Sequence, residues 1–126
     1  MTKIKRFEDL LSWQKARQTT NFIYDLTEHS KFSKDFRLSG QIQGAAGSVM
    51  HNIAEGFDSG TNPEFIRFLK LARRSASEVQ SELYLALDRN YIIQDELTTA
   101  YNLATETKQL INGMIKYLRN SKPPTA

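Results

Sequence analysis

Carboxylates at helical spacing are the residues of this sequence best suited to chemistry. Glu78 and Glu82 lie four positions apart, and Glu55 lies in an earlier segment that could pack beside them. Paired carboxylates can support acid–base catalysis or bind a metal ion. A diiron bundle, however, needs Glu-x-x-His motifs on two helices, and neither of the two histidines follows a glutamate by three positions. We therefore favour a structural hydrogen-bond network over a metal site.

This network would be built from polar residues at the borders of two apolar helix faces. On a helical wheel, four polar residues of one segment form a narrow strip, and the next segment offers further polar residues at the edge of its own apolar face. Buried polar groups of this kind can fix the register of two helices. The strip comprises Gln41, Ser48, Asn52 and Glu55, and the facing residues are Ser75, Glu78 and Glu82.

Basic residues offer a second kind of chemistry, the binding of phosphate groups. Such contacts are electrostatic and need no fixed motif. On a single copy, a solvated helix face is the alternative interpretation, but repetition around a ring would turn a few charges into a large basic surface. The candidates are Arg67, Lys70, Arg73 and Arg74 in the third helical segment and Lys3, Lys5 and Arg6 at the N-terminus.

Motifs of the common enzyme classes are missing from the sequence. There is no Ser–His–Asp order, phosphate-binding glycine loop, Rossmann fingerprint or HExxH, so we predict no catalytic residues, no cofactor and no metal site. The absence of cysteine favours a reducing compartment. No segment approaches the roughly 20 apolar residues of a membrane helix, and the basic N-terminus runs into Phe7-Glu8-Asp9, unlike a signal peptide. We expect a cytoplasmic protein without membrane contact, and its formal charge of +3 permits an acidic partner.

Four amphipathic segments must position these residues. At 126 residues and 40% hydrophobic composition, the chain predicts one domain over residues 1–126 with a buried core. Its six glycines and three prolines fall mostly between or at the ends of long periodic segments, and nothing indicates a strand. The predicted helices span about residues 7–28, 36–56, 62–89 and 95–119, followed by a tail at 120–126.

Short connections between these helices predict their arrangement. Gly56 is placed to end the second helix, and the Thr61-to-Glu64 spacing with an Asn-Pro step predicts the start of the third. Asn90 can adopt the left-handed turn that ends it. Helices of similar length with short linkers pack antiparallel at about 20°. The predicted fold is all-α, an up-down-up-down antiparallel four-helix bundle.

The second helix is unusual because it lacks charge. From Leu38 to Phe57 its one formally charged residue is Glu55. Each helical glycine costs about 1 kcal/mol relative to alanine, so the glycines of this helix need a compensating contact. Small, uncharged surfaces are typical of buried protein–protein contacts. We predict that a neighbouring subunit covers this helix; the alternative is tight packing of the second and third helices within one chain. The residues in question are Gln41, Gly44, Gly47, Ser48, His51, Asn52 and Glu55.

Several of these motifs carry a family resemblance that covers about residues 6–119. They are Phe7-Glu8-Asp9-Leu10, Trp13-Gln14-Lys15-Ala16, Gln41-Ile42, Ala45-Ala46, Ser48, Asn52-Ile53-Ala54-Glu55-Gly56, Phe65-Ile66-Arg67-Phe68-Leu69 and Ser75-x-x-Glu78. The chain resembles the bacterial four-helix-bundle proteins encoded in intervening sequences of 23S ribosomal RNA genes. It is also similar to the accessory variability protein of diversity-generating retroelements. These resemblances imply a homopentameric ring, and for the second protein a basic barrel that binds nucleic acid and a reverse transcriptase.

The sequence departs from the common family pattern in the second helix. The family often has Arg-Arg where this chain has Gln43-Gly44, and Val-Ser-Val-Pro where it has Gly47-Ser48-Val49-Met50. Arginines of the third helix would have to replace the missing pair in any contact with RNA. Our leading hypothesis is a non-catalytic homo-oligomer that binds RNA or DNA through a repeated basic surface. The alternative is a protein-interaction scaffold that does not bind nucleic acid.

Overall fold

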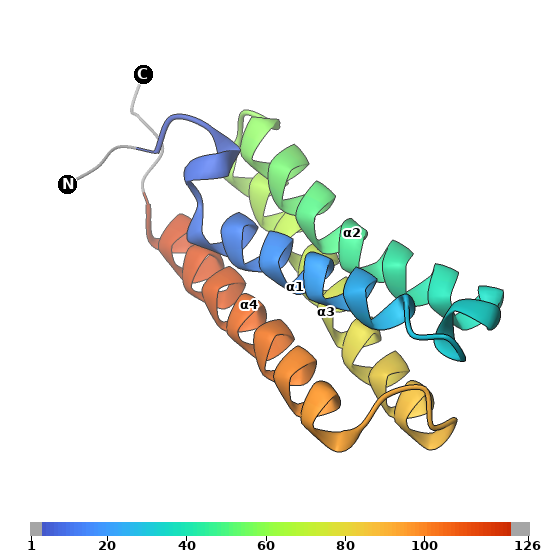
Figure 1. The fold of residues 1–126 in the computed structure, drawn as a ribbon. Helices are drawn as coiled ribbons and strands as arrows, with labels where there is room; N and C mark the ends of the chain where they lie inside the picture. The colour runs from blue at the N-terminus through green and yellow to red at the C-terminus, as the bar shows by residue number, and fades with distance from the viewer. Residues whose placement is uncertain (1–3, 122–126) are drawn as a thin grey trace.

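Four long helices and two short 3₁₀ turns make up the protein in this computed structural model, which describes residues 4–121. Each helix runs back along the one before it and packs against two neighbours, with the most extensive contact between the second and third (Figure 1). The prediction of an all-helical protein with four helices is confirmed. No helix within residues 4–121 is both long enough and apolar enough to cross a bilayer. The elements are η1 (Phe7–Asp9), α1 (Leu11–Thr27), η2 (Phe32–Lys34), α2 (Phe36–Asp58), α3 (Asn62–Asp88) and α4 (Gln94–Asn120).

The first helix begins later than its sequence periodicity predicts. Leu10 has an extended backbone (φ −73°, ψ 127°), which separates η1 from α1. The Asp9 carboxylate accepts hydrogen bonds from the backbone amides of Lys5 (3.2 Å) and Arg6 (3.3 Å), so this segment is held as its own turn. Lys3 and most of the predicted tail, residues 122–126, lie outside the described residues.

Gly56 does not end the second helix as predicted. α2 continues to Asp58, and the chain turns at Gly60, which has a left-handed backbone (φ 93°). A Cβ on Gly56 would lie 2.8 Å from Cβ of Phe68 and 2.9 Å from Cδ1 of Phe65, so this glycine permits a close crossing of α2 and α3. Gly56 therefore permits close packing between helices and does not terminate α2.

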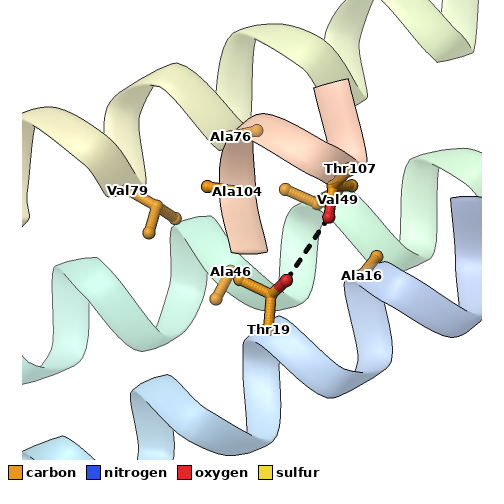
Figure 2. Close-up of a pocket in the computed structure, with 8 residues that line it drawn as sticks. All are labelled: Ala16, Thr19, Ala46, Val49, Ala76, Val79, Ala104 and Thr107. Atoms are coloured by element: carbon orange, nitrogen blue, oxygen red, sulfur yellow. Dashed lines mark hydrogen bonds between the residues drawn. The ribbon is translucent and has the colours of Figure 1, made fainter. Parts of the chain in front are cut away.

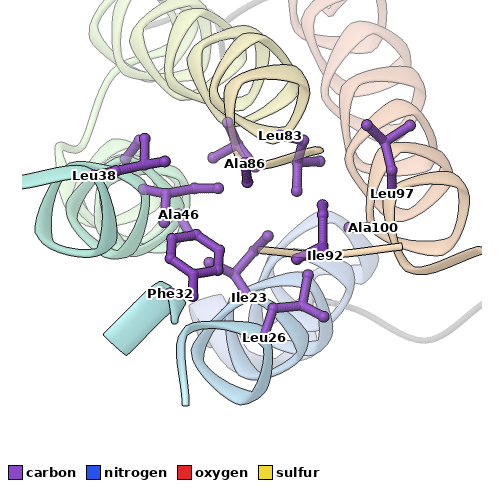
Figure 3. Packing of buried hydrophobic residues seen from close by; sticks show 13 residues of the cluster. Ile23, Leu26, Phe32, Leu38, Ala46, Leu83, Ala86, Ile92, Leu97 and Ala100 are labelled. Atoms are coloured by element: carbon purple, nitrogen blue, oxygen red, sulfur yellow. The ribbon is translucent and has the colours of Figure 1, made fainter. Parts of the chain in front are cut away.

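The core consists of two apolar clusters, one toward each end of the bundle. The cluster around Phe32 and Leu83 closes the end where α2 begins (Figure 3). A second cluster around Leu69 and Ile111 fills the end that contains the start of α1 and the end of α4.

An alanine layer lies where the helices reach mid-length. Each helix contributes one alanine: Ala16, Ala46, Ala76 and Ala104 (Figure 2). In the same layer the hydroxyls of Thr19 and Thr107 share a hydrogen bond of 3.3 Å. The remaining cavity is about 10 Å³, at the lower limit for one water molecule. Small side chains from all four helices thus fill the middle of the bundle.

Candidate nucleic-acid interface

Side-chain hydrogen bonds fix the register of α3 against α4. Asn62 Nδ2 donates to the carbonyl of Leu118 (3.4 Å), which places the start of α3 beside the end of α4. Further along, Arg73 Nη1 donates to Asn112 Oδ1 (2.7 Å). The N-terminal half of α3 therefore lies against the C-terminal half of α4.

Beyond the first turn of α3, which contains Glu64, these two adjoining halves carry only positive formal charge. Residues 65–77 of α3 and 107–121 of α4 contain seven lysines and arginines and no aspartate or glutamate. We call these two segments the basic half. Its cations are Arg67, Lys70, Arg73 and Arg74 on α3, which the sequence predicted, and Lys108, Lys116 and Arg119 on α4, which it did not.

The remaining lengths of the same two helices carry only negative formal charge. Residues 78–88 of α3 and 94–106 of α4 contain six acidic residues and no lysine or arginine. We call these segments the acidic half. The net charge of +3 therefore conceals a separation of charge along this pair of helices, with Glu64 in the first turn of α3 as the one acid at the basic end. The acids are Glu78, Glu82, Asp88, Asp95, Glu96 and Glu106.

The cations of α3 differ in their availability. Lys70 and Arg74 are exposed and make no ion pair with any part of the chain between residues 4 and 121. Arg67 instead forms a two-pronged pair with Glu64, just outside the basic half, at 3.0 and 3.1 Å, and its guanidinium lies 4.5 Å from the centre of the Phe68 ring. This pairing raises the pKa of Arg67 and lowers the pKa of Glu64. Lys70 and Arg74 are thus the cations of α3 best placed for phosphate.

Two half-buried cations are held in place by neutral partners. Arg73 donates to Asn112, and Lys108 Nζ donates to Gln80 Oε1 (3.0 Å). An amide oxygen positions a cation without neutralising it. Both side chains therefore keep their full positive charge in the field of the basic half.

The N-terminal candidates lie at the same end of the molecule as the basic half. Lys5 and Arg6 are exposed, and the guanidinium of Arg6 pairs with Glu8, which lowers the pKa of that carboxylate. Because this pair lies at the surface, solvent screens it. The N-terminus therefore adds one cation without an ion pair among the described residues, Lys5, to this end of the bundle.

Part of the predicted polar network is present between α2 and α3. The hydroxyls of Ser48 and Ser75 share a hydrogen bond of 3.0 Å, and Asn52 Nδ2 donates both to the Ser48 carbonyl (2.8 Å) and to its hydroxyl (3.0 Å). The other four predicted members make no hydrogen bond to this trio in the described chain: the exposed Gln41, Glu55 and Glu78, and the half-buried Glu82. The network is thus confined to three small side chains at the seam.

The carboxylates do not gather into a metal site. Gly56 packs on Phe65 and Phe68, so Glu55 lies far along α3 from Glu78, and no three metal-ligating side chains come together within residues 4–121. Oε1 of Glu82 is buried and has no hydrogen-bond partner among those residues. Burial, reinforced by the charge of Glu78, raises the pKa of Glu82 to about 7. Ionisation of this carboxyl therefore lowers the stability of the folded protein.

The outer face of α2 is open, and packing within the chain does not require the three glycines on it. A Cβ added to Gly40 or Gly44 would meet no heavy atom within 4 Å other than its chain neighbours and the backbone of its own helix. A Cβ on Gly47 would meet only the ring of His51, at 3.8 Å. Phe36, one turn before Gly40, is 83% exposed. We call these five residues the α2 outer face. The alternative of tight packing between α2 and α3 explains Gly56, but not Gly44 or Gly47.

Comparison with known proteins shows which family this chain resembles in sequence and structure. A search for similar solved structures finds a crystal structure from Bacteroides thetaiotaomicron, described as a protein with unknown function from the S23 ribosomal protein family. It is 25% identical, has a TM-score of 0.78, and the similarity covers 84% of this chain and 96% of that one. No curated protein matches the chain significantly. The sequence model of the 23S rRNA-intervening sequence proteins matches residues 8–113. The chain therefore belongs to the 23S rRNA-intervening sequence protein family.

Proposed function

We propose that this protein is a non-catalytic homo-oligomer that binds nucleic acid, and RNA in particular, through its basic half. The observation that carries the proposal is the arrangement of seven cations on two adjoining helical segments that contain no carboxylate. Since each phosphate contact releases condensed counterions, such a surface binds polyanions without any sequence motif.

Several features of the basic half support phosphate as its ligand. Lys70 and Arg74 are exposed without ion pairs to the described chain, and Arg73 is held by an uncharged group, so little of the charge is neutralised internally. A solvated helix face more commonly mixes both signs of charge at spacings of three and four residues. The family's description connects its members with ribosomal RNA genes, which favours RNA over DNA as the first ligand to test.

The proposal of self-association depends on the α2 outer face. Helical glycines that are not required inside the chain still cost about 1 kcal/mol each relative to alanine. Cover by a second subunit would compensate for that cost and would also bury Phe36. Four points stay predictions: the number of subunits, the pentameric ring, the relationship to the retroelement protein and the cytoplasmic location.

RNA binding can be tested by fluorescence anisotropy over a range of salt concentrations. We expect the logarithm of the binding constant to fall linearly with the logarithm of the salt concentration. The double substitution Lys70→Glu/Arg74→Glu should weaken binding roughly a hundredfold, because it removes two phosphate contacts and adds two repulsive charges.

A matched control is available at the opposite end of the bundle. Lys31→Glu/Lys34→Glu makes the same change in net charge at two exposed residues near η2, and it should weaken binding by roughly threefold or less at 0.1 M salt. Absence of binding at low salt, or an equal loss in both variants, would contradict the proposal. The protein-interaction scaffold would then be the better hypothesis.

Self-association can be tested by light scattering on the purified protein. We expect a native mass of several subunits, and we expect Gly44→Glu to weaken association at least roughly a hundredfold, because the new carboxylate would have to be desolvated in the interface. Gly113→Glu is the control, since Gly113 is also an exposed helical glycine with no atom near an added Cβ. A wild-type protein that stays monomeric at high concentration would refute this part.

A further inference from the structure

A recess lies at the end of the bundle beside the basic half. It encloses about 770 Å³ between the turn that joins α2 to α3 and the last turns of α4. This volume falls within the roughly 300–1,000 Å³ range of small-molecule sites. Three aromatic rings line it, those of Phe57, Phe65 and Tyr117, together with Met114. The recess therefore offers flat apolar surfaces of the kind on which a nucleobase stacks.

Tyr117 is the ring most accessible to a ligand. Its side chain is 65% exposed, and it also lines two neighbouring hollows of about 340 Å³ each. Gly113 lies one helical turn before it, and an added Cβ there would meet no heavy atom within 4 Å. The ring thus projects between hollows instead of packing into the core.

Two polar side chains of the recess retain unused hydrogen-bonding capacity. The Thr61 hydroxyl accepts a hydrogen bond from the Glu64 amide, which leaves its own hydrogen to donate. Asn62 donates through Nδ2 to the Leu118 carbonyl, and its Oδ1 has no partner within the described chain. One donor and one acceptor at the wall of an aromatic recess match the mixed edge of a nucleobase.

Positive charge borders the same recess. Lys116 and Arg119 flank Tyr117 in sequence, within a stretch of α4 that contains no acid, and Lys5 follows the recess residue Ile4. Asp9 lines one of the neighbouring hollows, but its carboxylate already accepts the amides of Lys5 and Arg6. Asp58 follows the recess residue Phe57, and Glu64, next to Thr61, is paired with Arg67. The three cations still outnumber Asp9 and Asp58, which favours a phosphate backbone at this end.

We propose that this recess accepts an unpaired base of a single-stranded nucleic acid, stacked on Tyr117, while the adjoining phosphates lie along the basic half. This inference rests on the proposed function and narrows it. Bases of a duplex are already paired and stacked, so they cannot enter a side recess without being extruded. The protein should consequently prefer single strands to duplexes of the same length.

The experiment compares a fluorescein-labelled 12-nucleotide single-stranded RNA with a 12-base-pair RNA duplex, using the full-length protein. Tyr117→Ala should weaken binding of the single strand roughly tenfold and binding of the duplex less than twofold, because stacking is lost while the charges remain. Tyr117→Phe keeps the ring and should bind the single strand within roughly twofold of wild type. Tyr24→Ala removes another half-exposed tyrosine, on α1, and serves as the control.

A second variant separates the recess from its neighbouring hollows. Gly113→Leu fills the two hollows that adjoin Tyr117 outside the recess and should leave binding of the single strand within roughly twofold of wild type, because the recess stays open. If single strand and duplex bind equally and Tyr117→Ala behaves as wild type, the base site is refuted. Loss of binding in Lys70→Glu/Arg74→Glu would show in that case that the proposed function still holds. Failure of the wild-type protein to bind either RNA would overturn both proposals.

Discussion

The two ends of the bundle are built for different purposes. At the acidic half, contacts between loops and helices close the end: Phe32 stacks on Tyr91 with ring centres 5.3 Å apart, the Tyr91 hydroxyl donates to Asp35 (2.9 Å), and a hydrogen bond of 2.6 Å joins His29 to Glu96. At the basic half, an aromatic recess stays open and Lys70 and Arg74 lack ion pairs to the described chain. Polar contacts therefore close one end, whereas the other leaves Lys70, Arg74 and the recess available to a ligand.

The alanine layer separates the apolar cores of these two ends. Since alanines, two valines and one threonine pair lie at that level, each end packs mainly around its own large residues. This division allows the surface chemistry of one end to change without repacking the other. Three experiments test how far the two ends differ.

The largest effect is expected at the close crossing of α2 and α3 near the basic half. Gly56→Ala should lower the free energy of unfolding by about 2 kcal/mol, because its Cβ would lie too close to Phe68 and to the Phe65 ring. Chemical denaturation measures this loss. On α4, Gly113→Ala meets no atom within the chain, lies outside the proposed subunit contact and should stabilise the protein by up to about 1 kcal/mol. Equal effects at the two positions would mean that the crossing is looser than described.

A smaller, pH-dependent effect is expected in the acidic half. The pKa of Glu82 is raised from 4.5 to about 7, so the folded protein holds a proton that the unfolded chain releases between these values. The cost to stability is therefore absent below pH 4.5, grows as the pH rises, and is complete above about pH 7. Glu82→Gln should stabilise the protein by about 1 kcal/mol above pH 7, after allowance for solvent screening, and change little below pH 4.5.

Unfolding measurements at pH 4 and pH 8 would check this dependence. Glu28→Gln is the control, because Glu28 is exposed and makes no ion pair within residues 4–121, so its removal should change the free energy of unfolding little at either pH. A Glu82 variant with the same stability increment at both pH values would show that burial does not perturb this carboxyl.

The smallest effect concerns the influence of the acidic half on RNA binding. Asp88 lies 14 residues after Arg74 on α3, about 21 Å along the helix axis, which is roughly twice the Debye length of about 10 Å at 0.1 M salt. Asp88→Asn/Asp95→Asn should therefore raise RNA affinity by less than about twofold at 0.1 M salt and by up to about threefold at low salt. Anisotropy titrations at both concentrations measure this, and a tenfold change would place RNA near the acidic half.

Periodicity predicts the helices well because one stripe of each helix must face the core. The trio of Ser48, Asn52 and Ser75 is also predictable, since wheel positions at the seam of two helices follow from the same periodicity. The glycines show the limit of this reasoning. Residue type alone does not distinguish Gly56 from Gly44. An added Cβ would clash with α3 at Gly56 and would face open space at Gly44.

The basic half could be predicted only in part. Arg67, Lys70, Arg73 and Arg74 stand out because they are concentrated in eight residues, whereas the cations of α4 are scattered and were masked by its broad apolar face. Their contribution depends on the antiparallel register of α3 and α4, which a linear sequence does not provide. The sequence signal for these cations is the absence of aspartate and glutamate from residues 107–121.

Separation of charge along α3 and α4 also has a consequence for encounter with a ligand in solution. A body with positive and negative poles carries a large electric dipole moment, and a polyanion exerts a torque on it before contact. The field would turn the molecule so that the end with the recess leads, which speeds association and rejects approaches by the opposite pole. In a ring of aligned subunits these moments would add along the axis, so one rim of the assembly would attract RNA while the other repelled it.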